Sequence, residues 1–137
     1  MIRYVVLPLA IAAAFSAHAE TANDMLARYT QEAARSQPGF AASAERGLTF
    51  FVRKWNVTDK MPNCAACHTE RPASDGSHVI TAKPIKPLAP AANPERLSSA
   101  AKVEKWFRRN CTDVLGRECS AAEKADFVQF LATAGGA

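Results

Sequence analysis

Two cysteines and a histidine stand close together near the middle of the chain, as Cys64-Ala65-Ala66-Cys67-His68. Two thiols separated by two residues can add to the two vinyl groups on one edge of a porphyrin, and the adjacent histidine can then bind the iron. A zinc site would need a second closely spaced pair of ligands, and Cys111 and Cys119 lie too far apart in sequence for one. A thioredoxin-like redox motif would follow a strand in a βαβ pattern, which is not found around these residues. The spacing therefore predicts one covalently attached haem c, bound through Cys64 and Cys67, with His68 as its proximal axial ligand.

The ligand on the other side of the iron is less obvious. Electron-transfer cytochromes usually close this position with a methionine or a second histidine. The methionines of this chain are Met1, Met25 and Met61, and none of them follows His68. His78 comes only ten residues after His68, so its path to the opposite face of the haem is cramped. The residues alone leave open an unligated iron, a weak and unusual ligand, or His78, and the first two favour binding of a small external molecule.

The elements around these residues are predicted to be helices joined by turns. Apolar residues at helical spacing predict three helices, the first capped by Asn23 or Asp24 and ending near Arg35. The other two run over about residues 41–55 and 98–109. A fourth begins at the capping box Ser120-Ala121-Ala122-Glu123 and ends at Gly135-Gly136. Few segments alternate as strands do, so the predicted fold class is all-α.

The remaining parts of this prediction concern packing and the long connection. Gly47 is expected to allow close approach of another helix, and Leu48 belongs to the apolar stripe of the same predicted helix. The core around the haem and between the helices is expected to contain four aromatic residues: Phe51, Trp55, Trp106 and Phe127. The segment 80–94 contains four prolines, which exclude a regular helix or a central strand. We expect it to be an extended loop that covers the haem.

The first residues have the features of a secretory signal peptide. Arg3 precedes a short apolar run, and Ala17-His18-Ala19 has the form of a cleavage site. An uncleaved membrane anchor is disfavoured because the run is short and Pro8 interrupts it. We therefore expect residues 1–19 to be removed and residues 20–137 to form a single, monomeric cytochrome c domain in the periplasm.

The net charge is weak evidence about partners. It is +4 at pH 7, and loss of Arg3 with the signal peptide leaves +3. Two ionised haem propionates would cancel most of this charge, so the composition argues against a nucleic-acid partner. A local basic group, made of Lys102, Lys105, Arg108 and Arg109, is either a solvated helix face or a surface that steers an acidic redox partner.

Several segments resemble the sphaeroides haem protein family, a set of small class-I-like cytochromes c. The resemblance is carried by Lys102-Val103-Glu104-Lys105-Trp106-Phe107-Arg108-Arg109-Asn110-Cys111, Val114-Leu115-Gly116-Arg117 and Cys119, by Ala44-Glu45-Arg46-Gly47, by the haem-attachment motif and by Pro87-Leu88-Ala89-Pro90. It spans nearly all of the expected mature chain. It implies a class-I-like cytochrome c fold, with Asn110 as sixth ligand of the oxidised haem and a disulfide between Cys111 and Cys119. The related cytochrome c double-prime has a histidine at the place of Asn110.

Asn110 is also a chemically reasonable ligand for a redox-dependent site. Its amide oxygen is a neutral, hard and weak donor, which suits Fe(III) better than Fe(II). The freed side-chain NH2 could then donate a hydrogen bond to a bound diatomic molecule. Asn110 can equally be the C-cap of the third predicted helix.

The resemblance implies a cytochrome that binds O2 or NO when reduced and exchanges electrons with another cytochrome, either multihaem or membrane-bound. The alternative is a plain periplasmic electron carrier whose haem is permanently ligated. A haem enzyme that reduces oxygen or peroxide ranks last, because no convincing acid-base pair is found near the distal face. The optical spectrum of the reduced haem would distinguish the first two functions.

Overall fold

The computed structural model describes residues 20–135, so the predicted signal peptide, residues 1–19, lies outside the described residues. The described elements are α1 (Ala22–Ser36), α2 (Ala44–Val52), α3 (Ala65–His68), β1 (Gly76–Ser77), β2 (Pro84–Ile85), α4 (Ala100–Leu115) and α5 (Ala121–Thr133). The strands form only a two-residue antiparallel pairing, so the all-α prediction is confirmed. Within residues 20–135, the helices are too short or too polar to cross a membrane.

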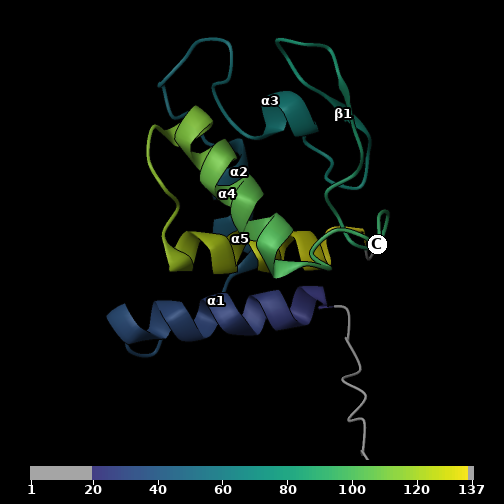
Figure 1. Cartoon of the computed structure of the whole chain (residues 1–137). Helices are drawn as coiled ribbons and strands as arrows, with labels where there is room; N and C mark the ends of the chain where they lie inside the picture. The colour runs from purple at the N-terminus through teal and green to yellow at the C-terminus, as the bar shows by residue number, and fades with distance from the viewer. Residues whose placement is uncertain (1–19, 136–137) are drawn as a thin grey trace, which may run out of the picture.

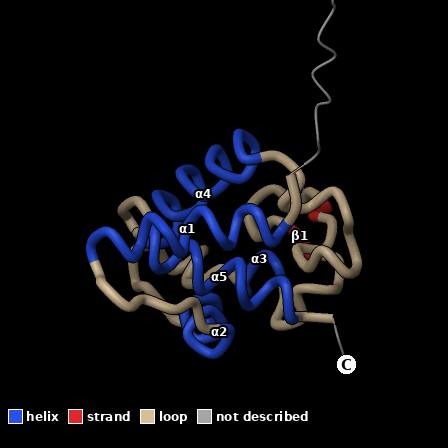
Figure 2. Tube along the Cα trace, turned by 90° about the horizontal axis from the view of Figure 1, so that it is seen from below, coloured by secondary structure: helices blue, strands red, loops and turns tan. Residues whose placement is uncertain are grey.

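The helices are arranged around α5. Helix α5 packs against both α1 and α2, and the α1–α5 pair lies at the opposite end of the molecule from α3 (Figure 1). Seen from below, α2 and α4 lie on opposite sides of this pair (Figure 2). The long connections, which include the β1–β2 hairpin, surround α3 at the other end.

Aromatic side chains join four of the helices. Phe107 of α4 packs edge-on against Tyr29 of α1 and Phe127 of α5, with ring centroids 5.7 Å apart in both pairs. Phe50 of α2 contacts Phe127 from the other side at 6.1 Å. Edge-to-face geometry stabilises such pairs beyond the area they bury. One aromatic side chain of α5 therefore links α2 to α4.

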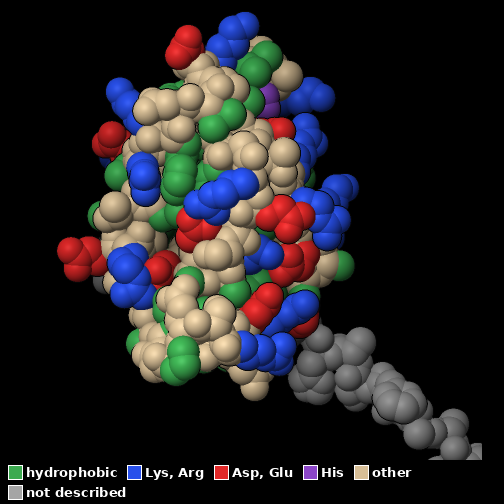
Figure 3. Space-filling model, turned by 90° about the vertical axis from the view of Figure 1, so that its left-hand side faces the viewer, with side chains coloured by type: hydrophobic (Ala, Val, Ile, Leu, Met, Phe, Trp, Pro, Cys, Tyr) green, Lys and Arg blue, Asp and Glu red, His purple; other side chains and the backbone are tan. Residues whose placement is uncertain are grey.

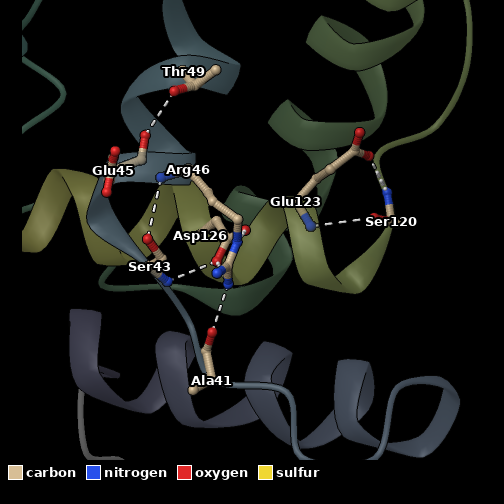
Figure 4. A network of polar contacts seen from close by, with 8 residues as sticks. All are labelled: Ala41, Ser43, Glu45, Arg46, Thr49, Ser120, Glu123 and Asp126. Atoms are coloured by element: carbon tan, nitrogen blue, oxygen red, sulfur yellow. Dashed lines mark hydrogen bonds and ion pairs between the residues drawn. The ribbon is translucent and has the colours of Figure 1, made fainter.

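The crossing of α2 and α5 depends on Gly47, as the sequence predicted. A Cβ atom at this position would overlap the Asp126 backbone oxygen and would lie 2.7 Å from the Phe130 Cβ. Beside this crossing the Asp126 carboxylate is buried, with 6% of the residue exposed. It accepts hydrogen bonds from the Ser43 backbone N–H and from Nε and Nη2 of Arg46, at 2.7, 2.7 and 2.8 Å (Figure 4). Asp126 thus fixes the start of α2 to α5.

The helix boundaries differ in part from the predicted ones. Helix α1 is capped by Thr21, whose hydroxyl accepts from the Asp24 N–H while the Asp24 carboxylate accepts from the Thr21 N–H. The predicted cap at Asn23 or Asp24 is therefore wrong: Asp24 is the third residue of the helix and closes a capping box with Thr21. The predicted box of Ser120 and Glu123 is confirmed at the start of α5. Gly136 at the predicted end of α5 lies outside the described residues.

Helix α4 is longer than predicted and α2 is shorter. Helix α4 does not stop near Arg109 but continues to Leu115, and Gly116 ends it in the left-handed conformation with φ of +70°. Helix α2 ends at Val52, whose carbonyl accepts from the Asn63 side chain at 2.8 Å. The placement of Leu48 on the apolar face of α2 is wrong, since Leu48 is 43% exposed. Trp106, which was expected to pack around the haem and between helices, is 46% exposed.

Candidate haem-binding site

The haem-attachment motif forms the single helical turn α3, and one asparagine holds it in place. The side-chain oxygen of Asn63 accepts the Ala66 N–H at 2.8 Å, while its NH2 donates to the Val52 carbonyl at the end of α2. The backbone N–H of the nearby Trp55 donates to the Pro62 carbonyl at 2.9 Å. The structure shows that Asn63 anchors α3 to α2.

The three residues of the motif are chemically ready to bind a prosthetic group. Cys64 and Cys67 are free thiols, and both are partly buried. Burial raises the pKa of the Cys64 thiol to about 12. Burial and, to a smaller extent, the positive charge of Arg96 lower the pKa of His68 to about 4. The imidazole is therefore neutral near pH 7, which leaves a nitrogen lone pair for a metal.

The loops after His68 pack directly onto the motif. Gly76 of β1 lies so close to it that an added Cβ would overlap the Cys67 carbonyl oxygen and lie 3.1 Å from the His68 Cα. Further along, the N–H groups of Leu88 and Ala89 both donate to the Pro72 carbonyl, at 2.8 and 2.9 Å. Segment 80–94 contains no helix, as predicted, and contributes only the edge strand β2.

Asn110, the residue that the family resemblance implied as distal ligand, lies within α4 and is exposed. It is five residues before the helix end, so a C-cap role for Asn110 is wrong. Trp106 lies one helical turn earlier on the same side, because residues four apart are neighbours on a helix. Its exposed indole leaves a large apolar surface beside Asn110. Cys111 points instead to the core and forms the implied disulfide with Cys119, with Cα atoms 5.7 Å apart.

The other candidate ligands are occupied elsewhere. The Nδ1 atom of His78 accepts hydrogen bonds from the Ile80 and Thr81 N–H groups, at 3.2 and 3.3 Å, which holds the ring against its own hairpin. Met25 is 1% exposed inside the core. Met61 is partly buried and packs against the same core. Asn110 is thus more open to a ligand-binding role than these three residues.

The residues of this region fit a covalently bound haem. Two free thiols and a neutral imidazole share one helical turn. They do not fit zinc, because Cys111 and Cys119 are joined to each other. Among residues 20–135, no group of three or more histidine, cysteine or acidic side chains could hold a metal ion.

Sequence comparisons agree with this assignment. Residues 37–131 match the family model described as a domain of unknown function, DUF1924. The chain is 41% identical over 125 residues to cytochrome c'' of Methylophilus methylotrophus, covering 87% of each chain. It is 38% identical over 133 residues to the cytochrome c-type protein SHP of Cereibacter sphaeroides, covering 96% of this chain and 98% of that protein.

Solved structures of the same two proteins have the same fold. Oxidised SHP, described as an oxygen-binding cytochrome c, aligns with a TM-score of 0.76 at 37% identity, over 84% of this chain and 98% of its own. Oxidised cytochrome c'' aligns with a TM-score of 0.77 at 40% identity, over 82% and 94%. A solution structure of cytochrome c'', described as giving insight into haem-ligand detachment, aligns with a TM-score of 0.70 at 40% identity, over 82% and 92%.

Proposed function

The chain belongs to the DUF1924 family and to the same group of small cytochromes c as cytochrome c'' and SHP, and we propose that it is a redox-active cytochrome c that binds O2 or NO when reduced. The observation that carries the proposal is the position of Asn110, which is exposed on α4 beside an open indole. The methionines of residues 20–135 are in or against the core. The distal side is therefore left to a weak ligand.

Three residues are proposed to hold the cofactor. Cys64 and Cys67 would each form a thioether, and His68 would bind the iron through its neutral imidazole. The haem c so held would supply a one-electron redox centre and an iron that can take a small ligand. Two further residues hold the backbone of Cys64, Cys67 and His68 in place. Asn63 fixes the start of α3, and Gly76 lets β1 lie against the end of α3.

Asn110 is proposed as the ligand of the oxidised iron only. Its neutral amide oxygen would bind Fe(II) more weakly than Fe(III), so Asn110 would be free of a reduced iron and its NH2 could donate a hydrogen bond to O2 or NO. The Cys111–Cys119 disulfide begins at the next residue, and we propose that it fixes the backbone while the Asn110 side chain moves. The described detachment of a haem ligand in cytochrome c'' supports this proposal.

Electron exchange with another cytochrome, multihaem or membrane-bound, completes the proposed function. The four basic residues of α4 are exposed and are the proposed contact with an acidic partner: Lys102, Lys105, Arg108 and Arg109. Arg109 also lies 3.8 Å from Asp113, so one of these charges is partly neutralised. We further propose that residues 1–19 direct export and that residues 20–137 act as a monomeric domain in the periplasm.

The deciding experiment is the optical spectrum of both oxidation states, with and without carbon monoxide as probe. We expect a ferrous high-spin spectrum and rapid uptake of carbon monoxide. Asn110→Ala should change the ferric spectrum, because the sixth ligand is removed. Thr112→Ala, another exposed residue of α4, is the matched control and should leave it unchanged.

Two outcomes would contradict this proposal in different ways. A six-coordinate low-spin ferrous haem that takes up no carbon monoxide would show a plain electron carrier. An unchanged ferric spectrum in Asn110→Ala would show that Asn110 does not bind the iron. His78→Ala would then test the remaining histidine, whose Nε2 atom is not used in the hydrogen bonds of its hairpin.

A further inference from the structure

Arg96 lies between the hairpin and α4, and it is held by two backbone carbonyls. Its Nε donates to the Pro87 oxygen and its Nη2 to the Lys86 oxygen, both at 2.8 Å. These bonds use two of the five N–H groups of a guanidinium. The planar group is therefore fixed in position, while donors remain for a further acceptor.

The charge of Arg96 has no acidic partner among the described residues. The ion pairs within residues 20–135 use Arg46, Arg109, Arg117 and Lys124 as cations. Arg96 is only partly exposed, and burial lowers its pKa. Removing a cation from water without a counter-ion is unfavourable, so a carboxylate that arrives with a ligand would be bound strongly.

The anchoring of Arg96 places it in the loops around the haem-attachment motif. Lys86 and Pro87 directly follow β2, which pairs with β1. Gly76 of β1 lies against the backbone of Cys67 and His68. The next two residues of the loop, Leu88 and Ala89, bind the Pro72 carbonyl just after the motif. The guanidinium is thus held by the same loops that enclose α3.

We propose that Arg96 binds a propionate carboxylate of haem c and acts as its counter-charge. This inference rests on the proposed function, because it requires a haem bound at Cys64, Cys67 and His68. A guanidinium fits a carboxylate with two parallel hydrogen bonds, and its positive charge offsets the negative charge of the carboxylate. The fixed positive charge would also favour the reduced haem, whose iron carries one positive charge less.

The competing explanation is that Arg96 only ties the loop through its two carbonyl bonds. Arg96→Lys separates the two roles, because lysine keeps the positive charge but cannot reproduce the two-carbonyl clamp. Arg96→Gln removes the charge. Arg35→Gln is the matched control, since Arg35 is an exposed arginine in the last turn of α1, at the other end of the molecule from α3 (Figure 1).

The test is the midpoint potential of the holoprotein, measured by spectroelectrochemistry at neutral pH. We expect Arg96→Gln to lower it, so that the ferric-to-ferrous ratio at a fixed potential rises about threefold to tenfold. Arg96→Lys should keep most of the wild-type potential, and Arg35→Gln all of it. An unchanged potential in Arg96→Gln, or an equal fall in Arg96→Lys, would overturn the proposal.

Two further measurements keep the result unambiguous. The mass of each protein reports covalent haem, so a wild-type chain without haem refutes the proposed function, whereas haem with an unchanged potential refutes only the role of Arg96. Resonance Raman spectra of the unaltered protein guard against a variant that does not fold. The propionate bending mode should lie at the frequency of a hydrogen-bonded carboxylate, and the frequency of a free propionate would refute the role of Arg96.

Discussion

At the scale of single residues, the haem-attachment motif depends on neighbours that carry no reactive group. Asn63 satisfies a backbone N–H at the start of α3 and a carbonyl at the end of α2. Gly76 offers only the absence of a side chain, which lets β1 lie on the backbone of Cys67. Reactive residues need such support, because ligands are useful only when the backbone that bears them is fixed.

Gly76→Ala should destabilise the protein by about 1–3 kcal/mol, because the new methyl group overlaps a backbone carbonyl that cannot move freely. The measurement is the free energy of unfolding of the holoprotein in urea. Ser77→Ala, at the exposed next position, is the control and should stay within about 0.5 kcal/mol. Equal stability of the two variants would show that the hairpin can move away from α3.

The structural roles of some residues could be predicted from the sequence, and those of others could not. Gly47 was predicted correctly, because a glycine within an apolar helical stripe usually marks a close crossing. The role of Gly76 was not predicted, since the segment that it contacts precedes it by a loop. Asp126 and Arg96 were missed for a similar reason: their partners lie 80 and 9 residues away, and no local pattern connects them.

At the scale of elements, α4 positions both Asn110 and the disulfide. Its end was predicted too early because Asn110 is a good C-cap residue by type. The better signal was Gly116, which follows Leu115 and adopts the left-handed conformation that glycine accepts most easily. Because the helix continues to Leu115, Asn110 lies in its regular part and Cys111 points toward the core. Side chains at a frayed helix end would not be held in such fixed directions.

Removing the disulfide should lower the free energy of unfolding by about 2–3 kcal/mol, since it closes a short loop in the unfolded chain. Cys111→Ala with Cys119→Ala makes this change and avoids free thiols near the haem cysteines. Urea unfolding of the double variant against the wild type gives the difference. If the two proteins unfold at the same urea concentration, the bond acts only on the Asn110 backbone and not on stability.

The α2–α5 junction makes a second element-scale prediction. Asp126→Ala should cost about 2–4 kcal/mol, because it leaves Arg46 and the Ser43 N–H without their acceptor. Asp113→Ala is the matched control. Asp113 is exposed and lies 3.8 Å from Arg109, so its loss should cost less than about 0.5 kcal/mol. Thermal unfolding measures both, and equal costs would mean that solvent replaces the acceptor at Asp126.

At the scale of the whole molecule, the helical architecture could be predicted and the haem end could not. Four helices have apolar patterns or caps long enough to recognise, such as the capping box at Ser120. The turn α3 and the strands β1 and β2 have four, two and two residues, too few for any period to appear. The prediction therefore found the motif residues but not the loops that hold them.

The surface carries charges of both signs, and this affects how stability depends on pH. On the face in Figure 3, basic and acidic side chains are interspersed. Two partly buried acidic residues, Glu104 and Glu123, have lowered pKa values. Burial raises the pKa of Glu123, but hydrogen bonds from Arg117 and Ser120 outweigh it. Burial likewise raises the pKa of Glu104, but its interactions with neighbouring groups, led by the hydrogen bond from Lys124 at 2.9 Å, lower it overall.

These lowered pKa values predict that the protein loses stability in acid. The unfolded chain takes up protons at Glu104 and Glu123 near the ordinary value of 4.5, before the folded protein does. Stability from these groups is therefore complete above that pH and is lost as the pH falls through their lowered values. Melting temperatures of the holoprotein between pH 7 and pH 3 measure the loss.

The double variant Glu104→Gln/Glu123→Gln should lose less stability in acid than Glu118→Gln, which removes an exposed carboxylate. Equal losses in the two variants would place the acid sensitivity elsewhere.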